Sequence, residues 1–79
     1  MFNIALTIGT FEKAQDLVRI AMKYSEDIDI KSGRFVIDAK SIMGVFSLDI
    51  SKPVTFCVHT EDGNVTAKIT NELHAAGII

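Results

Sequence analysis

Large apolar residues alternate with polar or small ones in several short stretches of the chain, which is the pattern of a half-buried β-strand. In residues 1–8 every second residue is large and apolar. The same alternation recurs in residues 27–31, 34–38 and 54–59. We therefore expect four strands, each turning one face toward a common core.

Three other stretches repeat apolar residues at helical spacing. Residues 11–24 predict a long helix, with Thr10 as its N-cap because a threonine hydroxyl accepts an amide proton of the first turn. A short helix opened by Ser41 is expected over residues 41–48. The pattern of the last helix begins between residues 62 and 65.

Glycines mark two of the connections. Gly33 predicts a tight turn between the second and third strands, in a hairpin that points Phe35 and Ile37 inward. Gly77 is expected to end the last helix. The resulting order, βαββαβα, predicts one α+β domain over residues 1–79. It would have two layers, with the helices on one face of a mostly antiparallel sheet and water on the other.

Composition narrows the class of partner. The chain has 79 residues, 48% of them hydrophobic, which is enough for a shared core. Its net charge of −2 argues against binding to nucleic acid, and no apolar run is long enough to span a membrane. The single cysteine, Cys57, cannot form an internal disulfide, which fits a reducing cytoplasm. Cys57 alternates with inward residues and is expected on the open face of the sheet.

The side chains that could carry chemistry are few and scattered. The two histidines, His59 and His74, fall in the fourth strand and the last helix, where a structural or solvated role is the simpler interpretation. Neither has partners at the spacing of a metal site. We therefore predict no enzyme activity, no metal and no cofactor.

The most informative segment is residues 39–48, which read AKSIMGVFSL. It resembles the regulatory-serine segment of HPr, the histidine-containing phosphocarrier protein of the bacterial sugar phosphotransferase system, whose members read K-S-[IL]-[ML]-G-[VL]-x-S-L-G-[IV]. The main departure is Asp49, where the family has glycine. The element order agrees over essentially the whole chain. The resemblance implies an open-faced sandwich with the antiparallel strand order 1-4-2-3.

The same resemblance draws attention to a missing histidine. HPr carries its phosphoryl group on the histidine of a G-[IL]-H-[AT]-R-P-A pattern. Here Thr10 stands at the histidine, Glu12 at the arginine and Lys13 at the proline. A threonine hydroxyl cannot form the labile phosphoramidate, and a glutamate repels a phosphate. We expect the carrier chemistry to be lost, so that no catalytic residue is assigned.

The resemblance also implies a regulatory site. Ser41 corresponds to the phosphorylated serine, Lys40 lies beside it, and Ile42, Met43 and Phe46 would form an apolar patch for docking proteins. The implied partners are an HPr serine kinase or a transcriptional regulator. In a known branch of the family, the catabolite-repression HPr-like protein, the histidine is likewise replaced and the serine kept. The simpler alternatives are that Ser41 only caps its helix and that the apolar residues belong to the core.

Three functions therefore stay open. The favoured one is a regulatory protein-binding module without phosphohistidine chemistry. A phosphocarrier that uses a displaced residue is opposed by the changes at Thr10, Glu12 and Lys13. The third is a scaffold or oligomerisation domain that is never phosphorylated.

Overall fold

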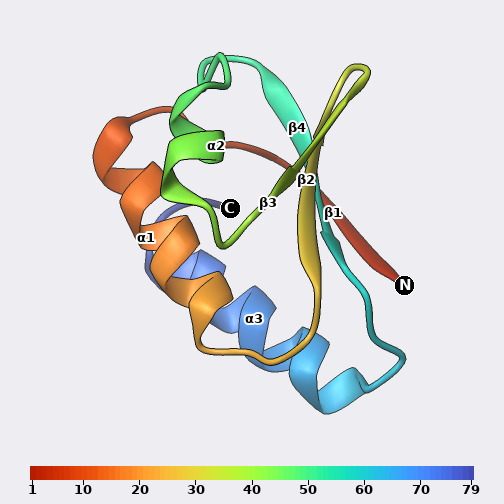
Figure 1. The fold of residues 1–79 in the computed structure, drawn as a ribbon. Coiled ribbons are helices and arrows are strands. Elements are labelled where there is room, and N and C mark those ends of the chain that lie inside the picture. The colour runs from red at the N-terminus through yellow and green to blue at the C-terminus, as the bar shows by residue number, and fades with distance from the viewer.

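Four strands form one antiparallel sheet in the order β1-β4-β2-β3, in a computed structural model that describes residues 1–79. The strand order implied by the family resemblance is confirmed. The elements, in chain order, are β1 Phe2–Thr7, α1 Phe11–Met22, β2 Ile28–Ser32, β3 Phe35–Asp38, α2 Ile42–Phe46, β4 Pro53–Val58 and α3 Gly63–Ala75 (Figure 1).

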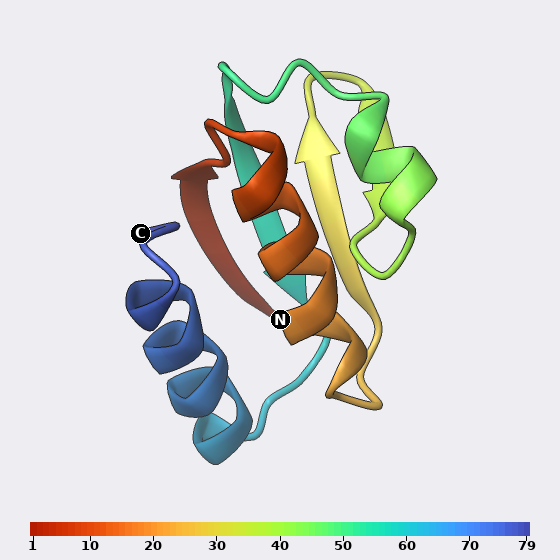
Figure 2. The ribbon, with the colours of Figure 1, turned by 90° about the vertical axis from the view of Figure 1, so that its left-hand side faces the viewer.

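The core lies between the sheet and its helices. All three helices are on the same side of the sheet, and the opposite face carries none (Figures 1 and 2). Strand β4 is central, and its Phe56 stands opposite Ile4 of β1 and Ile30 of β2. Phe56 and Ile30 are completely buried. The alternation seen in the sequence therefore sets the face on which the core forms.

A polar side chain caps the N-terminus of each helix. Thr10, Ser41 and Asp62 are the N-caps of α1, α2 and α3, and each accepts a backbone N–H from a residue two or three positions on. Gly77 follows α3 with a φ of 73°, which favours glycine, and so ends that helix as predicted. Helices α1 and α2 are both shorter than predicted. Helix α1 stops before Tyr24, whose N–H instead bonds the Ala21 carbonyl in a tighter turn.

The prediction that Phe35 points into the core is wrong. Its side chain is 70% exposed, because the tip of the β2–β3 hairpin extends beyond the helices (Figure 1). Only the far end of β3 is covered, where Ile37 lies against Gly44 of α2. Alternation along a strand therefore gives the side of the sheet but not the extent of the layer above it.

The open face of the sheet also has a buried residue. Cys57 lies between Asn3 of β1 and Asp29 of β2, on the side away from the helices, yet it is completely buried. Its place on the central strand lets neighbouring side chains cover it. None of the helices is long and apolar enough to cross a membrane.

Candidate functional site

Ser41 lies at the start of α2, where its Oγ accepts the Gly44 N–H at 3.2 Å. The expected capping role is therefore present in the structure. The hydroxyl is partly buried, and the first turn of α2 contains no acidic side chain. The only acidic side chain close to Ser41 in the sequence is Asp38, which precedes the helix and accepts the Lys40 N–H.

The packing of α2 decides which of its side chains face outward. Val45 is completely buried, and Gly44 lies so close to β3 that an added Cβ would be 2.6 Å from a methyl group of Ile37. With these two residues against the sheet, the other apolar side chains of α2 must point away from it. Their exposed fractions are 37% for Ile42, 79% for Met43 and 37% for Phe46.

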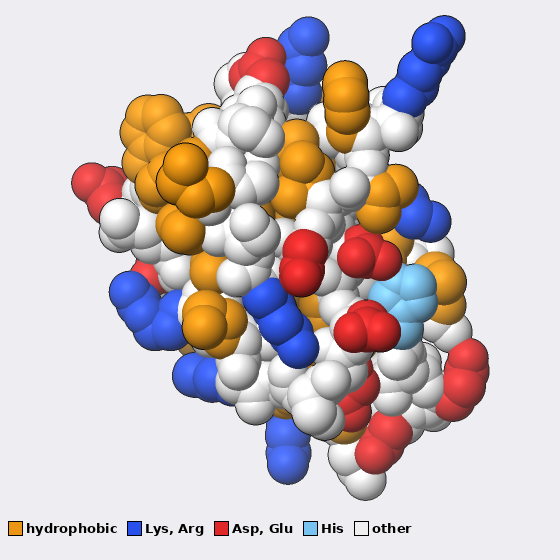
Figure 3. Space-filling model, in the orientation of Figure 1, with side chains coloured by type: hydrophobic (Ala, Val, Ile, Leu, Met, Phe, Trp, Pro, Cys, Tyr) orange, Lys and Arg blue, Asp and Glu red, His pale blue; other side chains and the backbone are white.

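An aromatic contact extends this apolar surface to the start of α1. The rings of Phe11 and Phe46 meet edge to face, with their centroids 5.5 Å apart. Phe11 is 63% exposed. We call Phe11, Ile42, Met43 and Phe46 the apolar patch; hydrophobic side chains gather over these two helices in Figure 3. Phe11 was not predicted to belong to this surface, because its only signal in the sequence was a large apolar residue directly after an N-cap.

Lys40 is held away from the serine that it precedes in the sequence. Its Nζ donates to the Tyr24 carbonyl at 2.7 Å, beyond the end of α1, and its backbone N–H donates to Asp38. The contact ties α1 to the segment that leads into α2. A positive charge opposite a phosphorylated Ser41 would therefore have to come from a partner, or from Lys40 after it leaves Tyr24.

The start of α1 has a different chemistry from the start of α2. Thr10 Oγ1 accepts the Lys13 N–H at 3.1 Å, and Glu12 places a negative charge in the first turn. Neither histidine is at this end: His59 follows β4 and His74 lies in α3. The start of α1 therefore presents a capping hydroxyl and a carboxylate.

A histidine–carboxylate pair lies on the open face of the sheet. His59 Nε2 is 2.6 Å from an Asp29 carboxylate oxygen, and Asp27, Asp38 and Lys40 line the same shallow hollow. Figure 3 shows the histidine with acidic side chains around it. The structure contains no group of three or more His, Cys, Asp or Glu side chains placed to hold a metal ion. One clue to this face was present in the sequence, since residues 57 and 59 fall on the same side of the fourth predicted strand.

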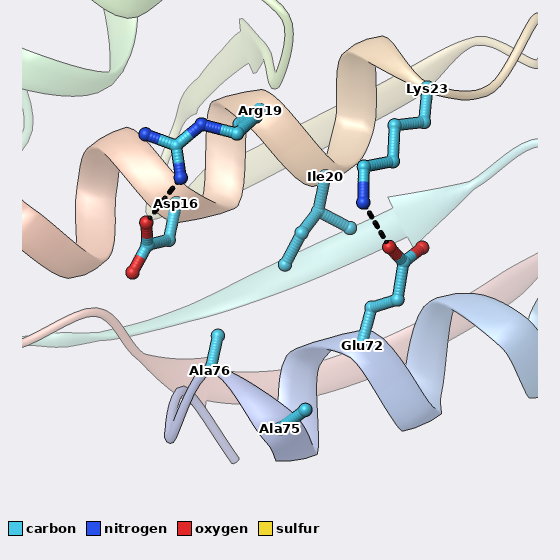
Figure 4. A pocket seen from close by; sticks show the side chains of 7 residues that line it. All are labelled: Asp16, Arg19, Ile20, Lys23, Glu72, Ala75 and Ala76. Atoms are coloured by element: carbon cyan, nitrogen blue, oxygen red, sulfur yellow. Dashed lines mark hydrogen bonds and ion pairs between the residues drawn. The ribbon is translucent and has the colours of Figure 1, made fainter.

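A second set of charges joins α1 to α3 (Figure 4). Lys23 Nζ lies 2.5 Å from a Glu72 carboxylate oxygen, and the Tyr24 hydroxyl donates to the other oxygen of that carboxylate. Burial, together with the Glu72 carboxylate, raises the pKa of Tyr24 to about 12. Hydrogen bonds from Lys23 and Tyr24 lower the pKa of Glu72. Since Arg19 also pairs with Asp16, at 2.8 Å, the groove between these helices presents paired rather than free charges.

Comparison with known proteins identifies the family of the chain. The family described as the PTS HPr component phosphorylation site matches residues 11–76. The chain belongs to the HPr family. The match begins at Phe11, directly after Thr10, and runs through the whole of α3.

Solved structures of HPr proteins have the same fold. HPr-C-His from Thermoanaerobacter tengcongensis is 26% identical with a TM-score of 0.74, over 92% of this chain and 90% of that one. The histidine-containing phosphocarrier protein of Mycoplasma is 21% identical with a TM-score of 0.72, over 98% of each chain. HPr from Bacillus anthracis str. Ames is 22% identical with a TM-score of 0.68, over 90% of this chain and 94% of the other.

These findings confirm the family and the HPr-like open-faced sandwich. The chain is thus a member of a family of phosphocarriers that work with partner proteins of the phosphotransferase system. The roles of Ser41, Lys40, Ile42, Met43 and Phe46 stay predictions, as does the cytoplasmic location.

Proposed function

We propose that this chain is a regulatory member of the HPr family that binds partner proteins through α2 and does not carry a phosphoryl group on histidine. The observation that carries the proposal is the apolar patch. It is exposed, it joins two helices through the Phe11–Phe46 contact, and Ser41 lies at its edge. Exposed apolar clusters on small proteins commonly mark interfaces.

A phosphate on Ser41 would act directly on such an interface. It would add a charge of about −1.5 to −2 and several strong hydrogen-bond acceptors beside Ile42 and Met43. Because Lys40 is bonded to Tyr24, the new charge is available to an arginine or lysine of the partner. The partner would then distinguish the two states by charge while the apolar contacts stay the same. An HPr serine kinase and a transcriptional regulator are the partners that the family suggests.

The absence of phosphohistidine chemistry is supported by three residues at the start of α1. Thr10 offers a hydroxyl in place of an imidazole, and that hydroxyl already accepts the Lys13 N–H. Glu12 would repel an incoming phosphoryl group at short range. The competing function, a scaffold that is never phosphorylated, shares this start of α1 and differs only in the use of Ser41.

Binding and phosphorylation of four forms of the chain test the proposal: wild type, Ser41→Ala, Ser41→Asp and Met43→Glu. We expect an HPr serine kinase to modify the wild type only at Ser41, so that Ser41→Ala gains no mass. Met43→Glu should weaken kinase and regulator binding at least about tenfold, because it places a charge in the centre of the apolar patch. Ser41→Asp should change affinity for the regulator while the chain remains folded.

Ile79→Glu is the matched control for the apolar patch. Ile79 is 36% exposed, similar to Ile42 and Phe46, but the C-terminus lies across α1 from α2 (Figure 2). If Met43→Glu binds as well as Ile79→Glu, the patch is not the interface. If the wild type is never modified at Ser41, the scaffold function is favoured.

Incubation with phosphoenolpyruvate and the general phosphotransferase enzyme tests the second part of the proposal, that the chain carries no phosphoryl group on histidine. We expect no phosphorylated chain in intact-mass spectra, whereas an ordinary HPr under the same conditions becomes phosphorylated. An acid-labile phosphate on this chain would show that a displaced residue has taken over the carrier role.

A further inference from the structure

The outer edge of β3 is unpaired. In the strand order β1-β4-β2-β3, β3 pairs only with β2 and its other side has no neighbour. Exposed edges are usually guarded by short length, charged residues, proline or a bulge, because their free N–H and C=O groups attract other strands. Strand β3 is short and ends in Asp38, but it has no lysine, proline or bulge, and Phe35 and Val36 on it are 70% and 62% exposed. These residues are neither in the core nor in the apolar patch.

The alternation of hydrogen-bonded and non-hydrogen-bonded pairs between β2 and β3 shows which backbone groups of β3 point away from β2. The hairpin has a two-residue loop flanked by the pair Ser32–Phe35, and such a flanking pair is hydrogen-bonded. The Ala39 N–H also bonds across to β2, at the Ile28 carbonyl. By alternation, the backbone groups of Val36 and the N–H of Asp38 point outward. An added strand would therefore be centred on Val36.

We propose that the β3 edge pairs antiparallel with the β3 edge of a second copy of this chain, with the two-fold axis at Val36. In this register, Val36 faces Val36, Phe35 faces Ile37, and Arg34 faces Asp38. The pairing places apolar residues together on both faces of the joined sheet and creates two ion pairs of opposite charge.

The charges of a single chain support this register. Neither Arg34 nor Asp38 forms an ion pair within the chain. Asp38 stands directly opposite Asp29 across β2 and β3, but Asp29 is paired with His59, and Asp38 accepts only the Lys40 backbone N–H. An arginine from a second copy would supply an ion-pair partner for Asp38. The apolar and charged residues of this edge thus complement themselves.

The size of the contact sets the strength to expect. Strand β3 has four residues, which places the interface in the small class, below about 1,200 Å² in total. The dimer should therefore be weak and form at high protein concentration. The joined sheet would have eight strands, with both copies of α2 on its helix-bearing side.

Sedimentation velocity of the full chain, over a concentration series up to the millimolar range, tests the proposal. We expect a reversible monomer–dimer equilibrium. Val36→Lys should abolish it, while Lys31→Glu, a charge change at the register partner of Val36 on β2, should leave it unchanged. A chain that remains monomeric throughout overturns the proposal. A dimer insensitive to Val36→Lys overturns it as well, because the contact must then lie elsewhere.

Complementary charge reversals test the register itself. Arg34→Asp and Asp38→Arg should each weaken self-association about tenfold, because each replaces two attractive pairs with two repulsive ones. Mixing the two variants should restore dimers, since an edge with acidic residues at both positions then meets an edge with basic residues at both. If the mixture associates no better than either variant alone, and both retain the wild-type circular dichroism spectrum, the register is wrong.

Discussion

The two ends of α1 are built in different ways. At its C-terminal end, Lys23 and Tyr24 both contact Glu72 of α3, and the Tyr24 carbonyl accepts a hydrogen bond from the Lys40 ammonium. At its N-terminal end, Phe11 is largely exposed and contacts the ring of Phe46. One end is fixed by polar contacts to distant parts of the chain, and the other presents apolar surface.

The difference shows how this fold separates stability from recognition. Polar contacts at the C-terminal end join three segments, while the buried face of α1, from Ala14 to Ala21, packs into the core. The exposed side chains of the first turn, Phe11 and Glu12, are not part of this core and are free to vary. Substitutions at the C-terminal end should therefore mainly change the stability of the chain, and substitutions of Phe11 at the N-terminal end should mainly change partner binding.

The largest effect on stability should come from Gly44, which packs α2 against β3 underneath the apolar patch. Gly44→Ala would place a Cβ 2.6 Å from an Ile37 methyl group, so α2 must shift from the sheet. We expect a loss of about 1–2 kcal/mol in the free energy of unfolding, after allowing for the better helix propensity of alanine. Partner binding should fall as well. Gly63→Ala is the control, because nothing lies within 4 Å of its added Cβ, and it should unfold like the wild type. Urea denaturation of both variants measures the difference.

An intermediate effect should appear at high pH, at the polar end. The folded state raises the pKa of Tyr24 from 10.0 to about 12, so the neutral phenol is favoured by folding. Its contribution to stability is therefore complete below pH 10.0 and is lost as the pH rises to about 12. We expect the wild type to lose more stability over this range than Tyr24→Phe, which has no phenol to ionise. Equal losses in thermal melts across the range would contradict the role of the Tyr24–Glu72 bond.

The Glu72 side of the same contact should make stability depend on pH in the opposite direction, with stability lost as the pH falls. Glu72 has a lowered pKa in the folded chain, so its contribution is present above its usual value of 4.5 and is lost as the pH falls through the folded value. Glu72→Gln should flatten this part of the stability profile, which thermal melts at acid pH would measure.

The smallest effect on stability should come from Phe11→Ala, at the exposed end. Phe11 is 63% exposed, so its loss removes little more than one edge-to-face contact, about 0.5 kcal/mol. Binding to the serine kinase, in contrast, should weaken about tenfold if the apolar patch is the interface. Phe35→Ala, which removes a phenylalanine that is 70% exposed at the hairpin tip, should leave kinase binding unchanged when the chain is monomeric. A larger loss of binding in Phe35→Ala would move the interface to the hairpin.

The order of elements and the faces of the strands were predictable from the sequence because they depend on local periodicity. Thr10 and Ser41 were recognised as caps for the same reason. The outward position of Phe35 was not, because it depends on where α2 ends above the sheet, which no pattern within β3 records. The strand order came from the family resemblance alone.

The candidate site was predicted in part. Ile42, Met43 and Phe46 are exposed, but the contribution of Phe11 depends on a contact between residues that are far apart in the sequence. The capture of the Lys40 ammonium by the Tyr24 carbonyl is likewise a tertiary contact, and the sequence order alone placed that charge beside Ser41. Pairings across the fold were thus the part that local reasoning could not supply.

Tyr24 has a further consequence for optical spectroscopy. The chain has one tyrosine and no tryptophan, so a single ring dominates its near-ultraviolet emission. In the folded chain the hydroxyl of that ring is bonded to a carboxylate on α3, an arrangement that quenches phenol fluorescence. Detachment of α3 from α1 should therefore brighten the emission even when the sheet is intact. The native sequence thus contains its own label for the docking of its last helix.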